Sequence, residues 1–474
     1  MKKKTKTLAK NFSILTVSNF TSKILVFLLV PIYTNILSTE EYGLYDLVIT
    51  TVSLLLPILT LNIIDAVMRF LMDKNIDKTQ VASIGFYYTS VSIIIFAVLI
   101  YFVDYFSIGQ NISGYKILIV AYYAFYVLNL YCTHIAKGIE KIKEIGVAGV
   151  AGTLTMIGMN ILFLCYVKLG LKGFFLANII SNVVPVFYLI FSLKLCNYIK
   201  FKKINYNLQY EMFFYCLPLI ASAIGWWVNC GSDKYIVTLF CGMSACGLLS
   251  VAYKIPSIIN TFQSIFIQAW QISAVKEYGE NDTAIFYGRT FSFLNIMTCL
   301  LCSILIILTK PIAYLLFSKE FYLSWQFVPF LLLSCVFNSA SGFLGPILSA
   351  KKDSKTMALS SLIGVVTNIG LNVAFVYIFG VIGTTIATAM SSFFIFIMRY
   401  ATVKYDLKIE KIITIPLTWM LLIIQTMIEV YTDMWIIELF IIVWILFVNH
   451  YLINEIMRIV KGLLFCTKNV NGRK

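Results

Sequence analysis

The chain has 474 residues, of which 60% are hydrophobic and only 12% are charged. Soluble globular chains are roughly a quarter charged, so this composition excludes a soluble protein and indicates a polytopic α-helical membrane protein. The formal net charge of +15 would indicate nucleic-acid binding in a soluble protein. In a membrane chain it follows from the lysines and arginines that fix helix orientation, so no nucleic-acid partner is expected.

Apolar runs long enough to cross a bilayer follow one another along the chain. They predict about fourteen membrane helices, at residues 11–37, 44–70, 80–104, 115–136, 145–168, 172–196, 210–231, 236–268, 288–310, 326–350, 356–379, 382–403, 411–430 and 434–455. The basic start, M-K-K-K-T-K, is interpreted as a cytoplasmic tail, and the even-numbered connections carry most of the lysines. An even number of helices then places both termini in the cytoplasm.

The connections offer little room for chemistry. The longest hydrophilic ones, near 69–80 and 273–288, are too short to fold as domains, which argues against an enzyme. Eleven cysteines lie mostly in apolar runs, and even Cys299-Leu-Leu-Cys302 is interpreted as a pair of small hydrophobic side chains. His134 and His450 have no ligand cluster nearby. We therefore expect no catalytic residue, no cofactor and no metal.

Two stretches of the sequence, residues 148–181 and 360–391, resemble each other. The matched residues are Gly152, Thr155, Ile157, Gly158, Asn160 and Phe163 with Gly364, Thr367, Ile369, Gly370, Asn372 and Phe375, and, after a two-residue deletion, Gly170, Gly173, Ala177 and Ser181 with Gly380, Gly383, Ala387 and Ser391. Internal repeats are typical of transporters. The small residues of the repeat, at a spacing of four, favour close helix packing, so the repeat is interpreted as scaffold.

Ionisable residues inside the membrane are costly and are candidates for function. In the first helix, Thr16, Asn19 and Lys23 share one face, which favours a water-filled cavity over interhelical hydrogen bonds with a snorkelling lysine. In the second, Asp65 and Arg69 are four residues apart and could form an ion pair. The alternative for Arg69 is an ordinary cytoplasmic anchor.

The seventh and eighth helices carry further candidates. The segment W-W-V-N-C-G-S-D-K-Y, residues 226–235, is expected to close the seventh helix, with its two tryptophans forming an interfacial belt or, less favoured, stacking on sugar rings. Asp233 and Lys234 would lie at the outer interface or just within it, with a salt-bridged turn as the alternative. Lys254, in V-A-Y-K-I-P-S, is expected in the middle of the eighth helix, lining a cavity with Tyr253 as a polar partner.

Five stretches share a pattern with a known family: S-K-I-L-V-F-L-L-V-P-I-Y-T-N-I-L-S-T-E-E-Y-G-L-Y-D-L, D-A-V-M-R-F, D-K-Y-I-V, G-L-L-S-V-A-Y-K-I-P and A-W-Q-I-S-A-V-K-E-Y. They resemble bacterial O-antigen- and capsule-type polysaccharide flippases of the multidrug/oligosaccharidyl-lipid/polysaccharide exporter superfamily. The resemblance covers about residues 8–400. It implies two pseudo-symmetric six-helix lobes, residues 1–205 and 206–410, with two additional helices and a tail in 411–474.

The resemblance also implies a function and a site. The function is to move polyprenyl-pyrophosphate-linked oligosaccharides from the inner to the outer leaflet of the bacterial cytoplasmic membrane by alternating access. The implied substrate-binding residues are Lys23, Arg69, Lys234 and Lys254, and Asp65 and Asp233 could couple an ion. The partners would be the lipid-linked substrate, membrane lipids and other polysaccharide-assembly membrane proteins. A multidrug antiporter of the same superfamily, or a membrane polysaccharide polymerase or ligase, are the alternatives.

Overall fold

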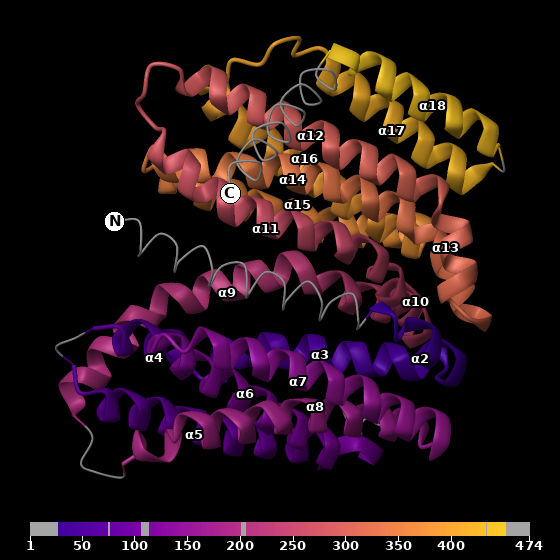
Figure 1. The fold of residues 1–474 in the computed structure, drawn as a ribbon. Helices are drawn as coiled ribbons and strands as arrows, with labels where there is room; N and C mark the ends of the chain where they lie inside the picture. Colours follow the sequence, from indigo (N-terminus) through magenta and orange to yellow (C-terminus); the bar gives the residue numbers. More distant parts are fainter. Residues whose placement is uncertain (1–26, 74–75, 106–112, 201–204, 433, 452–474) are drawn as a thin grey trace, which may run out of the picture. The chain divides into compact units, whose positions relative to one another are not determined.

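The computed structural model describes residues 27–73, 76–105, 113–200, 205–432 and 434–451. Every regular element within these ranges is a helix, which confirms the all-α fold class (Figure 1). The ranges contain 11 helices long and apolar enough to cross a membrane, and two shorter apolar ones, Met243–Ala252 and Trp435–Val448. The predicted count of fourteen is therefore not confirmed, and most of the first expected helix lies outside the described residues.

The described residues divide into two compact units. The first runs to Ser250 and also contains Leu316–Phe321, and the second comprises Val251–Leu315 and the chain from Tyr322 onward. The helices of the first unit are α2 (Val30–Ile36), α3 (Thr39–Leu59), α4 (Ile63–Leu71), α5 (Lys78–Tyr105), η1 (Ser113–Tyr115), α6 (Lys116–Gly138), α7 (Ile142–Asn160), the π-helix η2 (Ile161–Tyr166), α8 (Gly170–Leu193), η3 (Leu195–Asn197) and α9 (Tyr206–Cys241). The chain passes into the second unit within α10 (Met243–Ala252).

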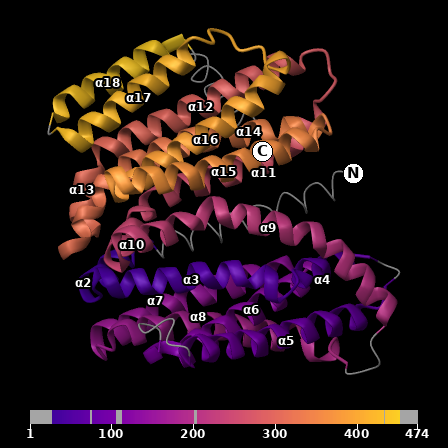
Figure 2. The same ribbon diagram turned by 180° about the vertical axis from the view of Figure 1, so that it is seen from behind.

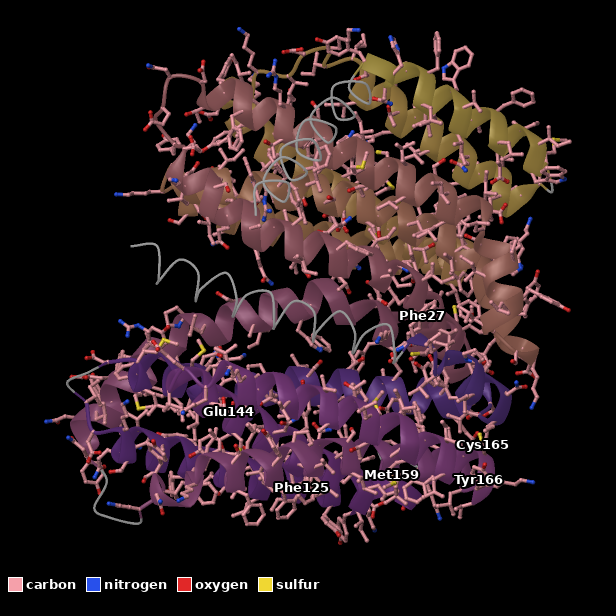
Figure 3. The ribbon with its side chains drawn as sticks, viewed as in Figure 1. Phe27, Phe125, Glu144, Met159, Cys165 and Tyr166 are labelled. Atoms are coloured by element: carbon pink, nitrogen blue, oxygen red, sulfur yellow. The ribbon has the colours of Figure 1, made fainter. Side chains whose placement is uncertain are left out.

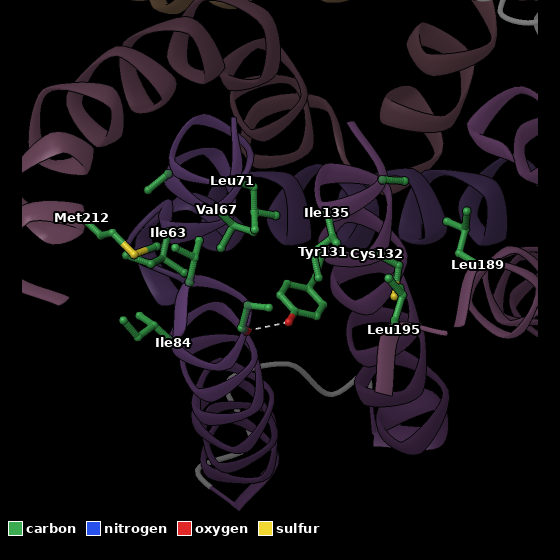
Figure 4. Packing of buried hydrophobic residues seen from close by; sticks show 14 of the residues in the cluster. Ile63, Val67, Leu71, Ile84, Tyr131, Cys132, Ile135, Leu189, Leu195 and Met212 are labelled. Atoms are coloured by element: carbon green, nitrogen blue, oxygen red, sulfur yellow. Dashed lines mark hydrogen bonds between the residues drawn. The ribbon is translucent and has the colours of Figure 1, made fainter. Parts of the chain in front are cut away.

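An apolar cluster to which α4, α5, α6, α7, α8, η3 and α9 contribute forms a core of the first unit, and Figure 4 shows part of it. Val67 and Ile135 are fully buried there. The phenol of Tyr131 is buried as well and donates to the Ala82 carbonyl at 2.6 Å, the bond drawn in Figure 4. A buried hydroxyl needs such a partner, since an unpaired one would cost stability. α9 packs on α3 and α4, so the compact unit extends beyond the expected lobe boundary at residue 205.

The second unit is built around α14 (Val328–Ala350), almost all of which is buried. Its other helices are α11 (Lys254–Lys276), α12 (Thr283–Ile307), α13 (Thr309–Leu316), η4 (Lys319–Phe327), α15 (Ser354–Phe379), α16 (Val381–Val403), η5 (Lys404–Asp406), α17 (Thr414–Tyr431) and α18 (Trp435–Val448), except for Leu316–Phe321, which belong to the first unit. α11, α12, α15, α16 and α17 pack on α14. Trp270 of α11 stacks on Phe343 of α14 with ring centroids 4.3 Å apart. Its indole nitrogen donates to the Phe343 carbonyl at 2.9 Å.

The internal repeat extends further than the matching residues indicate. α6 and α14 begin 212 residues apart (328 − 116), and so do α7 and α15 (354 − 142). The turn between α6 and α7 has the same backbone geometry as the turn between α14 and α15, because Glu140 and Lys352 both have φ of 60°. They also share a hydrogen bond, from Lys141 N to Ala136 O at 2.8 Å and from Asp353 N to Leu348 O at 2.9 Å. We call α6–α8 the first repeat and α14–α16 the second.

The matched glycines occupy the same places in both repeats. Gly170 and Gly380 have φ of 57° and 61°, a conformation that favours glycine. A Cβ added to Gly173 would meet Phe163, and one added to Gly383 would meet the equivalent Phe375.

The two-residue deletion has a structural counterpart in the helix before these glycines. Where the first repeat is two residues longer, the helix after Asn160 widens into the π-helix η2, whereas α15 runs on as an ordinary α-helix to Phe379. A π-helix accommodates inserted residues without breaking the helix. Figure 3 labels Glu144 near the start of α7 and Cys165 and Tyr166 at the end of η2.

Three expected boundaries are corrected by the structure. The seventh helix does not close at residues 226–235, because α9 continues without interruption to Cys241 and the break comes at Gly242, where φ is 88°. The expected eighth helix is divided at Tyr253, so that Lys254 is the first residue of α11 rather than the middle of a span. The expected second helix is divided into α3 and α4 at Leu61 and Asn62, with φ of 48° and 51°.

Candidate functional site

Lys234 and Asp46 form a half-buried ion pair between α9 and α3, with side-chain exposures of 17% and 13%. Thr50, one turn after Asp46, accepts from the Lys234 ammonium at 3.2 Å. Ser250 of α10 donates to Asp46 Oδ2 at 2.6 Å. We call these four residues the α3–α9 polar cluster. Asp46 was not among the predicted residues, although a carboxylate in an apolar helix is the signal that identified the others.

Glycines bring α10 close enough to α3 for the Ser250 contact. A Cβ on Gly43 would lie 2.2 Å from the Met243 carbonyl oxygen, and one on Gly247 would lie 1.9 Å from the Thr39 carbonyl oxygen. No larger residue fits between these backbones. The glycines thus determine the geometry of the polar cluster, as small residues do in other membrane helix contacts.

Two aromatic side chains of α9 border the α3–α9 polar cluster. The indole nitrogen of Trp227 donates to the Thr50 carbonyl at 2.9 Å and to Ser53 Oγ at 3.1 Å. The Tyr235 hydroxyl is hydrogen-bonded to Thr51. Trp227 therefore fastens α9 to α3, and the side chain of Trp226 lies outside the described residues.

Asp233 and Lys234 do not form the salt-bridged turn that was considered from sequence. Both lie within α9, where Asp233 is buried with 1% of its surface exposed. The partner of Lys234 is Asp46, 188 positions earlier in the chain (234 − 46). A pair so distant in sequence has no local signature.

Asp65 and Arg69 lie elsewhere in the first unit. Oδ1 of Asp65 is 3.4 Å from Nδ1 of His134 on α6, and its Oδ2 accepts from Asn62 at 2.9 Å. Lys137 of α6 is a further charged neighbour of Asp65. No ion pair between Asp65 and Arg69 is found among the described residues, and the Arg69 side chain is exposed. The Asp65 site therefore joins α4 to α6.

The Asp65 site and the α3–α9 polar cluster contact α9 at two widely separated places. The thiol of Cys216 donates to the Asn62 carbonyl at 3.3 Å, beside Asp65. Cys216 and Lys234 are 18 residues apart (234 − 216), which is about 27 Å along a helix that rises about 1.5 Å per residue. The predicted site residues of the first unit thus fall at two places rather than one.

Lys254 belongs to the second unit, where it is half-buried at the start of α11. The N-cap residue of α11, Tyr253, makes no side-chain capping bond and joins α10 to α11 in helical backbone geometry. Lys23, the remaining predicted residue, lies outside the described residues.

Arg399 of α16 is a half-buried cation that sequence reasoning missed. Its guanidinium donates to Ser360 Oγ at 3.0 Å, to the Ser341 carbonyl at 2.9 Å and to Ser361 Oγ at 3.4 Å. These partners are neutral and come from α14 and α15, so Arg399 links the three helices of the second repeat. It stands in the apolar run F-I-F-I-M-R-Y, and the cost of a charge at that place could have identified it.

The fold defines the class of protein. The chain is similar to the lipid II flippase MurJ in an inward closed conformation, with a TM-score of 0.71 and 16% identity over 94% of this chain and 99% of that one. It is also similar to an inward-facing multidrug resistance MATE family transporter of the MOP superfamily, with a TM-score of 0.67 and 14% identity over 82% and 95%. At these identities the likenesses establish the fold alone.

The sequence comparison gives the family. Residues 8–272, more than half of the chain, match the model of the family described as polysaccharide biosynthesis protein, and the chain belongs to this family. It is 25% identical over 195 residues to a probable low-salt glycan biosynthesis flippase, Agl15, from Haloferax volcanii. That match covers 40% of this chain and 41% of the relative.

Proposed function

We propose that this protein is a flippase that moves polyprenyl-pyrophosphate-linked oligosaccharides from the cytoplasmic to the outer leaflet for cell-surface polysaccharide synthesis. The observation that carries the proposal is the family match over residues 8–272 in a chain with the fold of a lipid flippase over 94% of its length. The name of the Haloferax volcanii relative supports the same activity.

The substrate poses a definite physical problem. A pyrophosphate must cross a hydrocarbon layer about 30 Å thick, and losing its water costs free energy unless cationic donors replace that water. We propose that Lys23, Arg69 and Lys254 supply these donors. The half-buried position of Lys254 at the start of α11 supports this role, because an ammonium partly shielded from water attracts an anion more strongly.

Lys234 is proposed as a fourth substrate-binding residue, with a condition that Asp46 imposes. Its ammonium is neutralised by the Asp46 carboxylate, so a phosphate can bind Lys234 only by replacing that carboxylate. The exchange would couple substrate binding to the contact between α3 and α9. Asp46→Asn should therefore make Lys234 more available to the substrate and weaken the contact at the same time.

The driving force and the setting of the protein are also proposals. An inside-negative potential favours outward movement of an anion by about 2.3 kcal/mol per charge per 100 mV, and Asp65 or Asp233 could couple a cation. We place the protein in the bacterial cytoplasmic membrane with both termini inside. Two six-helix lobes, 1–205 and 206–410, would alternate access, with 411–474 as an addition, and other polysaccharide-assembly membrane proteins are proposed partners.

Flipping of a fluorescent lipid-linked oligosaccharide in proteoliposomes tests the proposal. Lys254→Ala should reduce the initial flipping rate at least about tenfold, since a contact to a charged group contributes about 1.5–3 kcal/mol. The matched control is Lys276→Ala, an exposed lysine at the other end of the same helix, which should flip at the wild-type rate. Unchanged flipping by Lys254→Ala would remove this residue from the mechanism.

The alternative activity is multidrug antiport, which the likeness to the MATE family transporter supports. Cationic drugs need a carboxylate-rich cavity, whereas the proposed site residues are mostly basic. Accumulation of an organic cation in the same proteoliposomes separates the two activities. Cation transport without flipping of the lipid-linked sugar would favour the antiporter.

A further inference from the structure

α17 and α18, which lie beyond the residues matched by the family model, contain two buried carboxyl groups that the proposed function does not use. α17 and α18 lie side by side in both views (Figures 1 and 2) and pack on α12. Glu429 of α17 is 4% exposed and Glu438 of α18 is 1% exposed. Carboxylates are rare at such places because burying a charge is costly. Their presence therefore indicates a role.

The two carboxyl groups are in contact. Glu438 lies within hydrogen-bonding reach of Glu429 and of Gln425, and the Lys310 ammonium of α13 is 3.9 Å from Glu429 Oε2. Ser303 of α12 holds Gln425 in place: its hydroxyl donates to Gln425 Oε1 at 2.6 Å, and Gln425 Nε2 donates to the Ser303 carbonyl at 2.9 Å. The site is therefore assembled from four helices of the second unit.

The charges of Glu429, Glu438 and Lys310 indicate how many protons the two carboxyl groups hold. With both glutamates ionised, two negative charges would face one lysine in a buried place. Two carboxyl groups can hydrogen-bond to each other only if one of them carries a proton. Oε2 of Glu438 is buried and has no hydrogen-bond partner among the described residues. Burying an oxygen without a hydrogen-bond partner costs less free energy if it is the carbonyl oxygen of a neutral acid than if it belongs to a charged carboxylate.

The other groups around the site do not change this balance. Among the described residues, the charged groups that interact with Glu438 are Glu429 and Lys310. α14 has no charged residue along its length, and the charged residue of α12, Arg289, lies near the opposite end of that helix from Ser303. The ring of Trp325 lies under the Lys310 ammonium at 4.6 Å and keeps it in place.

We propose that Glu429 and Glu438 form a proton-binding site, in which Glu438 holds one exchangeable proton and Lys310 neutralises Glu429. The ligand is a proton because a metal ion would have to lie beside the Lys310 ammonium. Glu429 is two residues from the end of α17 and Glu438 is the fourth residue of α18, so both carboxyl groups lie near adjoining ends of their helices. This inference is independent of the cargo and places a protonatable site in the second unit, whereas Asp65 and Asp233 belong to the first.

Infrared difference spectroscopy on the purified full-length protein tests the proposal. The wild type should show a protonated-carboxyl band at neutral pH that disappears on alkalinisation. Glu438→Gln, which has nearly the same shape as the protonated acid, should lose this band. Glu40→Gln, at an exposed glutamate in the first turn of α3, is the matched control and should keep it.

Two charge variants separate a proton-binding site from a structural contact. Lys310→Met removes a positive charge and should raise the pH at which the band disappears, by about one to three units. Glu429→Gln removes a negative charge and should lower that pH. A band that persists in Glu438→Gln, or shifts of the same sign in the two charge variants, would overturn the proposal. Loss of the band on adding Na⁺ at constant pH would also contradict it, because the site would then take a metal ion.

Discussion

The two three-helix repeats, α6–α8 and α14–α16, have the same framework and different polar content. Their turns share φ values and hydrogen bonds, and their glycines make the same contacts. Leu189 of α8 corresponds to Arg399 of α16, 210 positions later (399 − 189), and Ala148 corresponds to Ser360. Leu189 and Ala148 belong to the apolar cluster of the first unit, whereas Arg399 and Ser360 are hydrogen-bonded.

The difference shows that one framework tolerates either an apolar or a charged interior contact, provided that both partners change together. Ser360 supplies an acceptor where Ala148 has only a methyl group. The view of the repeat as pure scaffold is therefore correct for the first copy and incomplete for the second. Exchanging residues between the repeats tests this conclusion.

The largest effect is expected from Leu189→Arg. The guanidinium would enter an apolar cluster without the acceptors that surround Arg399, and an unpaired buried charge costs more than about 4 kcal/mol. Thermal unfolding in detergent, followed by tryptophan fluorescence, should show a large loss of stability or a failure to fold. Leu189→Met, of similar volume, should cost less than about 1.5 kcal/mol. Equal behaviour of the two variants would contradict the comparison.

The second-largest effect is expected from the equivalent glycines. A Cβ on Gly383 would lie 2.1 Å from the Phe375 carbonyl oxygen, whereas one on Gly173 would lie 3.0 Å from its nearest neighbours. Gly383→Ala must displace backbone and should cost about 3 kcal/mol, and Gly173→Ala should cost about 1 kcal/mol. The same unfolding measurement checks the order, and the reverse order would show that the second repeat yields more easily than its contacts indicate.

Arg399→Lys should have a smaller effect. Lysine keeps the charge but lacks the guanidinium fork that reaches Ser341, Ser360 and Ser361 together. Loss of two of these bonds should cost about 1–2 kcal/mol. If stability were unchanged, Arg399 would not be what links α14, α15 and α16.

The smallest effect concerns the starts of α7 and α15. Lys141 and Asp353 are equivalent N-cap residues with nearly the same conformation, φ/ψ of −91°/61° and −88°/71°. Only Asp353 caps its helix, accepting from Thr356 N at 3.0 Å. Lys141→Asp should therefore add a cap to α7 and raise stability by about 1 kcal/mol. No gain would mean that the two turns differ in more than their side chains.

The cap of α15 also predicts a pH dependence. Hydrogen bonds from the side chain and backbone of Thr356 lower the pKa of Asp353 below its ordinary value of 3.8. A lowered pKa gives stability that is present above the ordinary value and is lost as the pH falls through the lowered one. Asp353→Asn keeps an acceptor without the charge, so its unfolding temperature should depend less on pH below about 4 than that of the wild type.

Much of the fold could be predicted from the sequence, because burial in a bilayer restricts a chain to helices of known length. Composition gave the class, and matching glycines such as Gly173 and Gly383 located the repeat. The boundaries of α9 and α10 could not be predicted from the sequence. The polar residues 232–235 suggested a break that does not occur, whereas the actual breaks, at Gly242 and Tyr253, lie within apolar sequence.

The sequence by itself determined which residues are costly to bury, since that depends only on residue type and on the apolar run around it. Only the tertiary structure decided what each of them contacts. Lys234 is paired with Asp46 and Asp65 with His134, on helices distant in the chain. Glu438 and Glu429 could not be recognised as a pair until α17 and α18 were seen packed together, because the free energy of a buried charge depends on its neighbours in space.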